Sequence, residues 1–269
     1  MSSDSFFLKY GPWALVTGAS DGIGRAIAGK LAERGLNLLL VGRRIERLSA
    51  LSDELARESG IEVIPISADL GSMAGIDLVL ERVSSLEIGL YVASAGFGTA
   101  GEFADNPAGE ELNMIDVNCR ALAALAHTLA GGMRERKRGG MIFMSSIVAF
   151  QGVANSANYA ATKAYVQSFA EGLAGELSPY NIDILASAPG PVATGFSTRA
   201  DMQMNGAASP DIVAAATLAA LGRRGTTRPG FQSKMLGYGL GILPRSMRTS
   251  ILTGVMSGMI KHRNATEKS

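Results

Sequence analysis

Short apolar runs alternate with longer amphipathic segments along most of the chain, and this order limits the fold more than any other feature. The apolar runs cover 13–19, 36–42, 61–70, 90–96, 141–146 and 181–190. Apolar residues recur at helical spacing in the segments between them. Strands that are apolar throughout and separated by helices form a parallel sheet covered on both faces. The sequence therefore predicts an α/β fold with a doubly wound parallel sheet.

Length and composition indicate a single domain over residues 1–269. A chain of this length suits one large α/β core better than two small ones. With 47% apolar and 18% charged residues, it is typical of a globular protein. A formal net charge of +1 and the lack of a long basic block argue against a nucleic-acid partner.

The residue types that form disulfides and metal sites are scarce. Cys119 is the single cysteine, and His127 and His262 are the only histidines. An internal disulfide is therefore excluded, and we expect no metal site. The first residues lack a basic region followed by an apolar stretch, so we expect no secretory signal and a cytoplasmic location.

Three helices can be placed by spacing and capping signals. A long helix is expected over about 110–137, with an apolar stripe of Leu112, Ile115, Leu122, Leu125, Leu129 and Met133. Another is expected over about 157–178. A third begins at Ser209 as N-cap, with Pro210 at its first helical position.

Two segments near the C-terminus are expected to border a substrate pocket. Residues 195–215 form a substrate-side loop that holds Phe196, Met202 and Met204 and few charges. Residues 235–269 form a C-terminal cap or subunit contact, with a peripheral membrane helix as the less favoured alternative. A proline and two arginines interrupt this segment, so no apolar run is long enough to span a membrane. The methionines point to an apolar substrate without defining its shape.

A glycine-rich turn follows the first apolar run and opens the first helix. The residues in it that we expect to contact a cofactor are Gly18, Ser20, Asp21, Gly22, Ile23 and Gly24. Gly18 permits the tight turn, Gly22 lets the backbone approach a pyrophosphate, and Gly24 lets the helix pack close to the sheet. The helix N-terminus supplies free N–H groups for the phosphates. The turn therefore predicts a dinucleotide site on a Rossmann-type sheet.

The end of the second apolar run indicates which dinucleotide binds. An NAD site has an acidic side chain about 20 residues after the glycine turn, which holds the ribose 2′-hydroxyl. Here Gly42 is followed by Arg43 and Arg44. Two guanidinium groups suit a 2′-phosphate, which they can bind through paired hydrogen bonds. The predicted cofactor is therefore NADP(H), with a pair of solvated surface arginines as the alternative.

Tyr159 and Lys163 lie four residues apart near the start of a predicted helix, so their side chains project from one face. The reference pKa of tyrosine is about 10. A neighbouring ammonium group favours the phenolate and brings this pKa closer to neutral. The pair alone is common on helix surfaces. Together with a cofactor turn on the same chain, it indicates an acid–base site.

With these motifs in this order, the sequence resembles the short-chain dehydrogenase/reductase family over most of residues 11–195. The family's cofactor turn matches from Thr17 to Gly24, and its tyrosine–lysine pair matches as well. Its active-site serine lies thirteen residues before the tyrosine, which selects Ser146. Its helix asparagine matches Asn118.

The resemblance implies further cofactor contacts. These are Asp69 and Leu70 at the adenine, Ala95 and Gly96 near its ribose, Tyr159 and Lys163 at the other ribose, and Pro189, Gly190, Val192 and Thr194 along the nicotinamide. Where the family often has Asn-Asn-Ala-Gly, this chain has Ala-Ser-Ala-Gly over 93–96. We expect the loss of the two asparagines to affect local stability more than chemistry.

The resemblance also implies a role for each active-site residue. Ser146 hydrogen-bonds the substrate oxygen, and Tyr159 transfers a proton to or from it. Lys163 lowers the tyrosine pKa and orients the ribose, while Asn118 holds a water that relays protons. The cofactor performs the hydride step. The expected function is an NADP(H)-dependent oxidoreductase that interconverts an alcohol and an apolar ketone or aldehyde, acting as a reductase.

Two other functions are weighed against this expectation. A catalytically silent NADP-binding regulatory or scaffold protein would keep the fold but would not need all four active-site residues. A sugar-nucleotide epimerase or dehydratase would need a longer C-terminal substrate domain, and its glycine spacing usually differs from the one seen here.

The helix that carries the tyrosine–lysine pair is rich in small residues, which let another helix approach its backbone closely. They are Ala160, Ala161, Ala164, Ala170, Gly172, Ala174 and Gly175. The family commonly pairs this helix and the 110–137 helix across a two-fold axis, so the resemblance implies a homodimer or homotetramer. Packing within the chain is the alternative.

Overall fold

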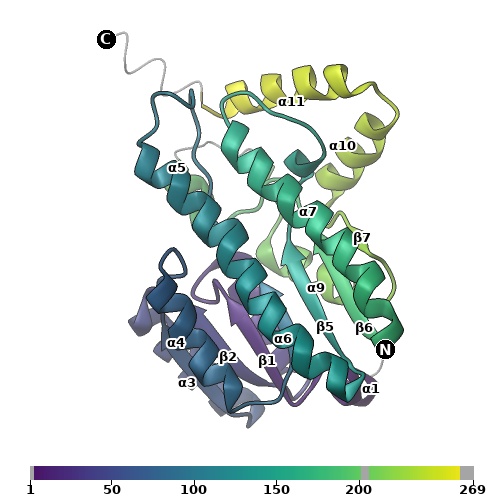
Figure 1. The fold of residues 1–269 in the computed structure, drawn as a ribbon. Coiled ribbons are helices and arrows are strands. Elements are labelled where there is room, and N and C mark those ends of the chain that lie inside the picture. Colours follow the sequence, from purple (N-terminus) through teal and green to yellow (C-terminus); the bar gives the residue numbers. More distant parts are fainter. Residues whose placement is uncertain (1–2, 201–205, 261–269) are drawn as a thin grey trace.

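The computed structural model describes residues 3–200 and 206–260 (Figure 1). Within them, seven parallel strands form one sheet in the order β3-β2-β1-β4-β5-β6-β7. The strands are β1 (Trp13–Thr17), β2 (Asn37–Gly42), β3 (Val63–Ser67), β4 (Ile88–Ala93), β5 (Gly139–Met144), β6 (Ile182–Ser187) and β7 (Thr226–Thr227). Each predicted apolar run overlaps one of the first six strands. The doubly wound, Rossmann-type parallel sheet is confirmed.

Helices cover both faces of this sheet. The α-helices of the described residues are α1 (Ser3–Tyr10), α2 (Gly22–Ala32), α3 (Ile45–Ser59), α4 (Met73–Ser84), α5 (Ala108–Ile115), α6 (Leu122–Arg136), α7 (Ala157–Leu177), α8 (Gly195–Arg199), α9 (Pro210–Ala220), α10 (Phe231–Gly241) and α11 (Arg245–Met259). Leu15 of β1 belongs to the core shared with α4, α6 and α7, while Val16 belongs to the core shared with α2, α3 and α9. Successive side chains of a strand point to opposite faces, so the strands are buried on both sides.

The strand order reverses between β1 and β4, and this reversal marks the ligand-binding edge. Strands β2 and β3 lie on one side of β1, and β4 to β7 lie on the other. In open α/β sheets, ligands bind beyond the carboxyl ends of the strands at such a reversal. The loops after β1, β4, β5 and β6 all end at this edge. They carry the glycine turn, Gly96, Ser146 and Pro189.

The long helix expected over 110–137 is not regular. A π-helical segment, Asp116–Ala121, separates α5 from α6. The apolar stripe is right for Leu122, Leu125, Leu129 and Met133, which are buried. It is wrong for Leu112 and Ile115, whose side chains are 63% and 43% exposed. A π-turn adds a residue to the helical repeat, so the residues before it face a different direction from that extrapolated along a regular helix.

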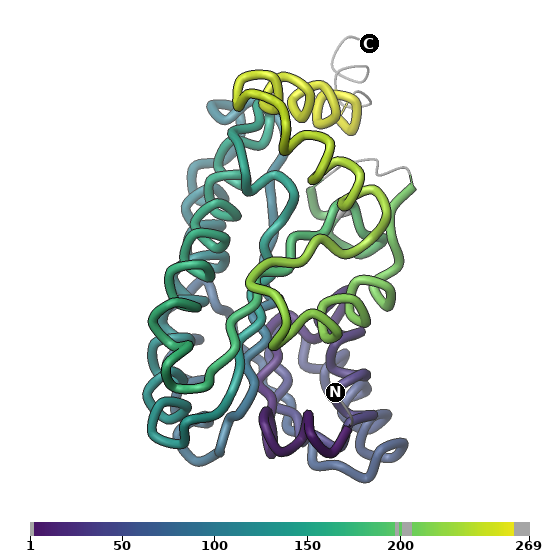
Figure 2. The backbone as a smooth tube through the Cα atoms, turned by 90° about the vertical axis from the view of Figure 1, so that its right-hand side faces the viewer, coloured from purple at the N-terminus to yellow at the C-terminus, as the bar shows by residue number. Residues whose placement is uncertain are grey.

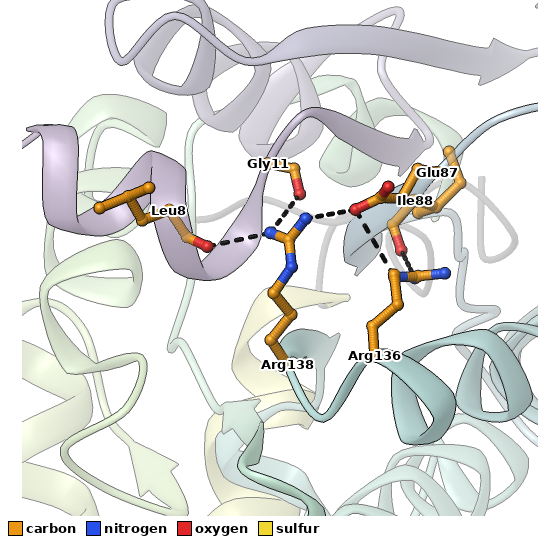
Figure 3. A network of polar contacts seen from close by, with 6 residues as sticks. All are labelled: Leu8, Gly11, Glu87, Ile88, Arg136 and Arg138. Carbon is orange, nitrogen blue, oxygen red and sulfur yellow. Dashed lines mark hydrogen bonds and ion pairs between the residues drawn. The ribbon is translucent and has the colours of Figure 1, made fainter.

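A polar network ties the start of the chain to the opposite edge of the sheet (Figure 3). It joins Leu8, Gly11, Glu87, Ile88, Arg136 and Arg138. Arg138 donates hydrogen bonds to the carbonyl oxygens of Leu8 and Gly11, at 2.9 and 3.0 Å, and forms an ion pair with Glu87. Arg136 donates to the carbonyl oxygen of Ile88 at 2.9 Å. The amino ends of β1, β4 and β5 are held together in this way.

Helices α10 and α11 lie beyond the carboxyl ends of the strands, as Figures 1 and 2 show. Leu252 and Met256 of α11 pack with Val148, Val153 and Ala160 in a third apolar cluster. This cluster holds α11 over the start of α7 and the loop after β5. Among the described residues, no helix is both long and apolar enough to cross a membrane.

Candidate active site

Ser146, Tyr159 and Lys163 come together at the carboxyl end of β5. Ser146 is the N-cap of the short 3-10 helix Ile147–Phe150, and Tyr159 and Lys163 lie one turn apart near the start of α7. A side-chain hydrogen bond joins Tyr159 to Ser146. All three side chains line one cavity of 390 Å³. A serine, a tyrosine and a lysine therefore face a shared space large enough for a small ligand.

Burial controls the protonation of these groups. It raises the pKa of Tyr159 to about 12, and the hydrogen bond with Ser146 only partly opposes this shift. It also lowers the pKa of Lys163 to about 8. The Nζ atom of Lys163 lies 5.7 Å from the centroid of the Tyr159 ring and donates a 2.7 Å hydrogen bond to the carbonyl oxygen of Met144. The expected lowering of the tyrosine pKa is therefore outweighed by burial, and the phenol is neutral at pH 7.

Asn118 lies in the π-helical segment and lines neither this cavity nor the adjoining groove. Its Oδ1 atom accepts a hydrogen bond from the backbone N–H of Phe97 at 3.1 Å, and its Nδ2 atom donates to the Phe97 carbonyl oxygen at 2.9 Å. Nδ2 also donates to Thr162 Oγ1 at 3.0 Å. The side chain thus joins the loop after β4 to α7. This makes it a positioning residue.

A groove of 620 Å³ extends from this cavity along the carboxyl ends of the strands. The predicted cofactor residues that line it are Gly18, Ser20, Asp21, Gly22, Ile23, Arg43, Arg44, Asp69, Leu70, Ala95, Gly96 and Thr194. Those that line the first cavity are Tyr159, Lys163, Pro189, Gly190 and Val192, and the two spaces share Ile23, Gly96 and Thr194. A ligand in the groove can therefore reach the serine, tyrosine and lysine.

The three glycines of the turn are required for different reasons. Gly18 has φ +68°, and a Cβ atom there would lie 2.7 Å from the backbone nitrogen of Ala95. Gly22 has φ +54°, and its Cβ would lie 2.7 Å from Cγ2 of Thr194. Gly24 does not line the groove; its Cβ would lie 2.3 Å from the Gly18 carbonyl oxygen. It allows α2 to approach β1, while the other two shape the groove.

The groove has an excess of positive charge. Its charged lining residues are Arg43, Arg44, Arg47, Arg199, Asp21 and Asp69. Asp21 caps α2 by accepting a hydrogen bond from Gly22 at 2.7 Å, and Arg44 and Arg47 lie 3.7 and 3.8 Å from its carboxylate. A glycine cradle at a helix N-terminus, flanked by guanidinium groups, fits the phosphates of a dinucleotide. The residues present therefore fit the cofactor that the sequence predicts.

Among the lining residues that sequence reasoning missed, three bear on the charge and shape of the groove: Arg47, Phe97 and Arg199. Arg47 could have been found, because it lies in the first turn of α3, which directly follows Arg43 and Arg44. Arg199 and Phe97 carry no local signal, since they meet only in the fold. The Cζ atom of Arg199 lies 3.8 Å over the Phe97 ring. The pKa of Arg199 is lowered by burial and then by the positive charge of Arg43, so the two guanidinium groups lie close enough to repel each other.

The segment expected to be a substrate-side loop is partly helical. Residues 195–199 form α8, and 210–215 belong to α9, which begins at the predicted Ser209 cap. Phe196 lines both spaces, and its ring centroid lies 5.4 Å from that of Tyr159. Met202 and Met204 lie outside the described residues.

A Rossmann-type sheet with a phosphate-binding turn and an adjoining serine, tyrosine and lysine defines a class of nicotinamide-dependent oxidoreductases. The family model for short chain dehydrogenases matches residues 12–205. The chain belongs to this short-chain dehydrogenase family. Its members bind NAD(H) or NADP(H), which is the kind of ligand that the residues of the groove fit.

Individual relatives differ in what their names describe. A very-long-chain 3-oxoacyl-CoA reductase from Anas platyrhynchos is 30% identical over 247 residues, which cover 90% of this chain and 79% of that protein. An inactive hydroxysteroid dehydrogenase-like protein from Homo sapiens is 33% identical over 192 residues, 70% of this chain and 58% of that one. A solved short-chain dehydrogenase from Sphingobium yanoikuyae in complex with NADPH has a TM-score of 0.79 and 31% identity, covering 90% of this chain and 95% of that one.

Proposed function

We propose that the protein is an NADP(H)-dependent reductase that converts an apolar ketone or aldehyde to an alcohol, or catalyses the reverse oxidation. The observation that carries this proposal is the hydrogen-bonded pair of Ser146 and Tyr159, with Lys163, in a cavity that adjoins an arginine-lined groove. The bound cofactor supplies the hydride. The chain's own residues hold the substrate oxygen and supply its proton.

The proton step follows from the geometry of the pair. The hydroxyl groups of Ser146 and Tyr159 are joined by a hydrogen bond, so a carbonyl oxygen placed between them is within reach of both. Because burial keeps the Tyr159 phenol neutral, it can donate its proton to the oxygen as negative charge develops there. The ammonium form of Lys163, near the ring, stabilises the phenolate that results. In the oxidation the same groups act in reverse.

The choice of NADP(H) over NAD(H) is supported by charge. The loop after β2 presents Arg43 and Arg44 to the groove, where an NAD site would hold a carboxylate. Arg47 and Arg199 add two further guanidinium groups, and Arg199 comes from a segment far from the others in the sequence. The NADPH complex of the Sphingobium relative is consistent with this choice.

The choice of an apolar substrate is supported by the walls of the cavity. Among the residues described, Lys163 is the one charged side chain that lines it. Helices α10 and α11 contribute six apolar side chains and one polar one, Gln232; the apolar ones are Met235, Leu236, Leu252, Val255, Met256 and Met259. We assign these helices as the cap of the substrate pocket, as expected for the segment from 235. The Anas relative is named for a substrate with a long acyl chain, which is apolar in the same sense.

Catalytically silent cofactor binding is the second candidate, and the human relative named inactive is the observation that favours it. In this chain, however, the serine, tyrosine and lysine are all present and share one cavity. Turnover is therefore the preferred proposal. The two candidates differ in a direct measurement, because a silent protein binds NADPH but consumes none.

The test is a panel of aliphatic, aromatic and steroid ketones assayed by NADPH absorbance. We expect turnover with at least one apolar ketone, and a loss of about 100-fold or more in Tyr159→Phe with NADPH binding retained. Tyr165→Phe is the matched control: Tyr165 is on the same helix, 43% exposed, and lines neither space. Equal turnover by Tyr159→Phe and the wild type would overturn the mechanism, and NADPH binding without turnover across the panel would favour the silent candidate.

A further inference from the structure

Large apolar side chains recur on the exposed faces of α10 and α11. On α10 and at its C-cap these are Phe231, Met235, Tyr238 and Ile242, which recur at steps of four, three and four and therefore form one stripe. On α11 they are Met247, Ile251 and Val255, each four residues apart. Ile242, near the turn between the helices, is 86% exposed. We call these seven residues the outer apolar face.

Large apolar side chains grouped on an exposed surface commonly mark a contact site. The buried side of α11 already packs on the body of the protein through Leu252 and Met256. The outer apolar face therefore does not arise from poor packing of the helix. On α11 it is a second apolar stripe, in addition to the one that packs on the body of the protein.

The charges that the two helices themselves carry are of one sign. No aspartate or glutamate occurs between Asp211 and Glu267. On α10 and α11 the charged residues are Lys234, Arg245 and Arg248, all basic. An apolar stripe on helices that carry only cations is complementary to a surface that is apolar inside and anionic outside.

We propose that α10 and α11 dock on an anionic lipid surface, with the outer apolar face inserted among the acyl chains and the basic residues at the headgroups. A second copy of the chain is a poorer occupant, because every charged residue on α10 and α11 is basic and pairing two such surfaces would bring like charges together. The docking is peripheral, since neither helix can span the bilayer. Ile242 lies deepest in this arrangement.

The position of the face links it to the active site. Met235 and Val255 belong to the outer apolar face and also line the cavity that holds Tyr159. The face therefore borders the mouth of the substrate pocket. An apolar carbonyl compound dissolved in the bilayer would enter the pocket without crossing water. This last step rests on the proposed function, whereas the docking itself does not.

The docking is tested by flotation of the full-length protein with vesicles. We expect the wild type to float with vesicles that contain roughly 30–40% phosphatidylglycerol, because basic residues are attracted to an anionic membrane surface. It should float at least about ten-fold less with pure phosphatidylcholine, and binding to the anionic vesicles should weaken at 0.5 M salt, roughly the level at which surface charges are screened. Absence of the wild type from the floated fraction in all conditions would overturn the proposal.

Two variants separate the apolar and the charge contributions. Ile242 lines neither the cavity nor the groove, so Ile242→Glu should leave the ketone reductase activity on soluble substrates unchanged. Its flotation should fall about ten-fold, because a charge replaces an apolar side chain in the outer apolar face. Leu8→Glu is its matched control, because Leu8 is 72% exposed on α1, at the other end of the molecule. Lys234→Glu with Arg245→Glu should remove the preference for anionic vesicles. Equal flotation of Ile242→Glu and Leu8→Glu would contradict the assigned face.

Two further measurements distinguish the remaining outcomes. If Ile242→Glu instead converts a larger species to a smaller one in light scattering, and the wild type binds no vesicles, then the face joins two copies and the proposal is wrong. Tyr159→Phe should float as the wild type does, because docking does not depend on turnover. A failure of the proposed reaction would therefore leave the flotation result standing, and a failure of flotation would leave the reaction standing.

Discussion

At the scale of single residues, burial changes the chemistry of the tyrosine–lysine pair. Both side chains leave water when α7 packs over the end of β5, and each then disfavours its charged form. The pKa of Tyr159 rises to about 12, and that of Lys163 falls to about 8. The neutral phenol is suited to donate a proton, and the lysine can gain or lose one near neutral pH.

The shift at Lys163 predicts how stability depends on pH. The pKa of Lys163 in the folded protein, about 8, is below the ordinary lysine value of 10.5, so the unfolded chain binds more protons between these values. The Lys163 contribution to stability is therefore absent below pH 8, grows as pH rises toward 10.5, and is fully present above it. By pH 10 it should be on the order of 2 kcal/mol.

The measurement is urea denaturation of the cofactor-free protein from pH 7.5 to 10, compared with Lys163→Met. The pKa values of Tyr159 and Cys119 are raised mainly by burial, which acts in the opposite direction and is common to both proteins; the charge of Lys163 makes a smaller, opposing contribution at Cys119. The stability of the wild type relative to Lys163→Met should therefore increase with pH. A constant difference over this range would show that Lys163 is not buried as an uncharged group.

Arg43 predicts the discrimination between cofactors. A charged hydrogen bond contributes about 1.5–3 kcal/mol, so Arg43→Ala should weaken NADPH binding by roughly 10- to 100-fold and leave NADH binding nearly unchanged. Fluorescence titration of both cofactors measures this. Arg57→Ala, on the exposed side of α3, is the control. Equal losses of affinity for NADPH and NADH would show that Arg43 does not bind the 2′-phosphate and is a solvated surface residue.

At the scale of elements, the π-helical segment between α5 and α6 decides where Asn118 points. Its side chain makes three hydrogen bonds that join the loop after β4, the π-helical segment and α7. These three elements carry the groove wall at Gly96 and the reactive Tyr159. Their relative position therefore depends on one amide.

Removal of that amide should destabilise the protein. In Asn118→Ala the backbone N–H and carbonyl oxygen of Phe97 lose their partner in a buried place, which costs about 3 kcal/mol in the free energy of unfolding. Urea denaturation measures the change. Asn113→Ala, one turn earlier on α5, should cost less than about 1 kcal/mol. Comparable losses in the two variants would show that the three-way contact does not stabilise the fold.

At the scale of the whole molecule, the exposed small residues of α7 indicate that the chain forms an oligomer. Ala161, Gly172 and Gly175 face outward, and a Cβ atom at either glycine would meet nothing within 4 Å. Packing within the chain therefore does not use this part of the small-residue face, although it does use Ala160 and Ala170, which are buried. Leu112 and Ile115 on the neighbouring α5 are also exposed.

We therefore predict a homodimer or homotetramer that pairs through α7. Gly172→Arg should shift it toward a smaller species, because the arginine prevents close approach of two backbones. Light scattering after gel filtration measures the mass. Gly29→Arg is the control, since Gly29 is a similarly open glycine on α2. A monomeric wild type with full activity would contradict the prediction.

Much of the fold and the placement of the site follow from local features of the sequence. The periods of the apolar residues identify strands and helices along the chain. Because crossovers between parallel strands are almost always right-handed, few topologies are then possible. The glycine turn after β1 and the tyrosine–lysine pair one helical turn apart are also signals between residues that are close in the sequence. For this reason the sheet, the glycine cradle and the pairing of Tyr159 with Lys163 could be predicted, whereas the place of Ser146 beside them was implied by the family resemblance.

Only the tertiary structure decided what depends on residues far apart in the chain. The partners of Asn118 required the π-turn, and the stacking of Arg199 on Phe97 required two loops to meet over the groove. The direction of the pKa shift at Tyr159 required its burial. The sequence determined the elements and their order because periodicity and turn chemistry act between near neighbours. Burial and charge proximity depend on long-range packing, which no local pattern records.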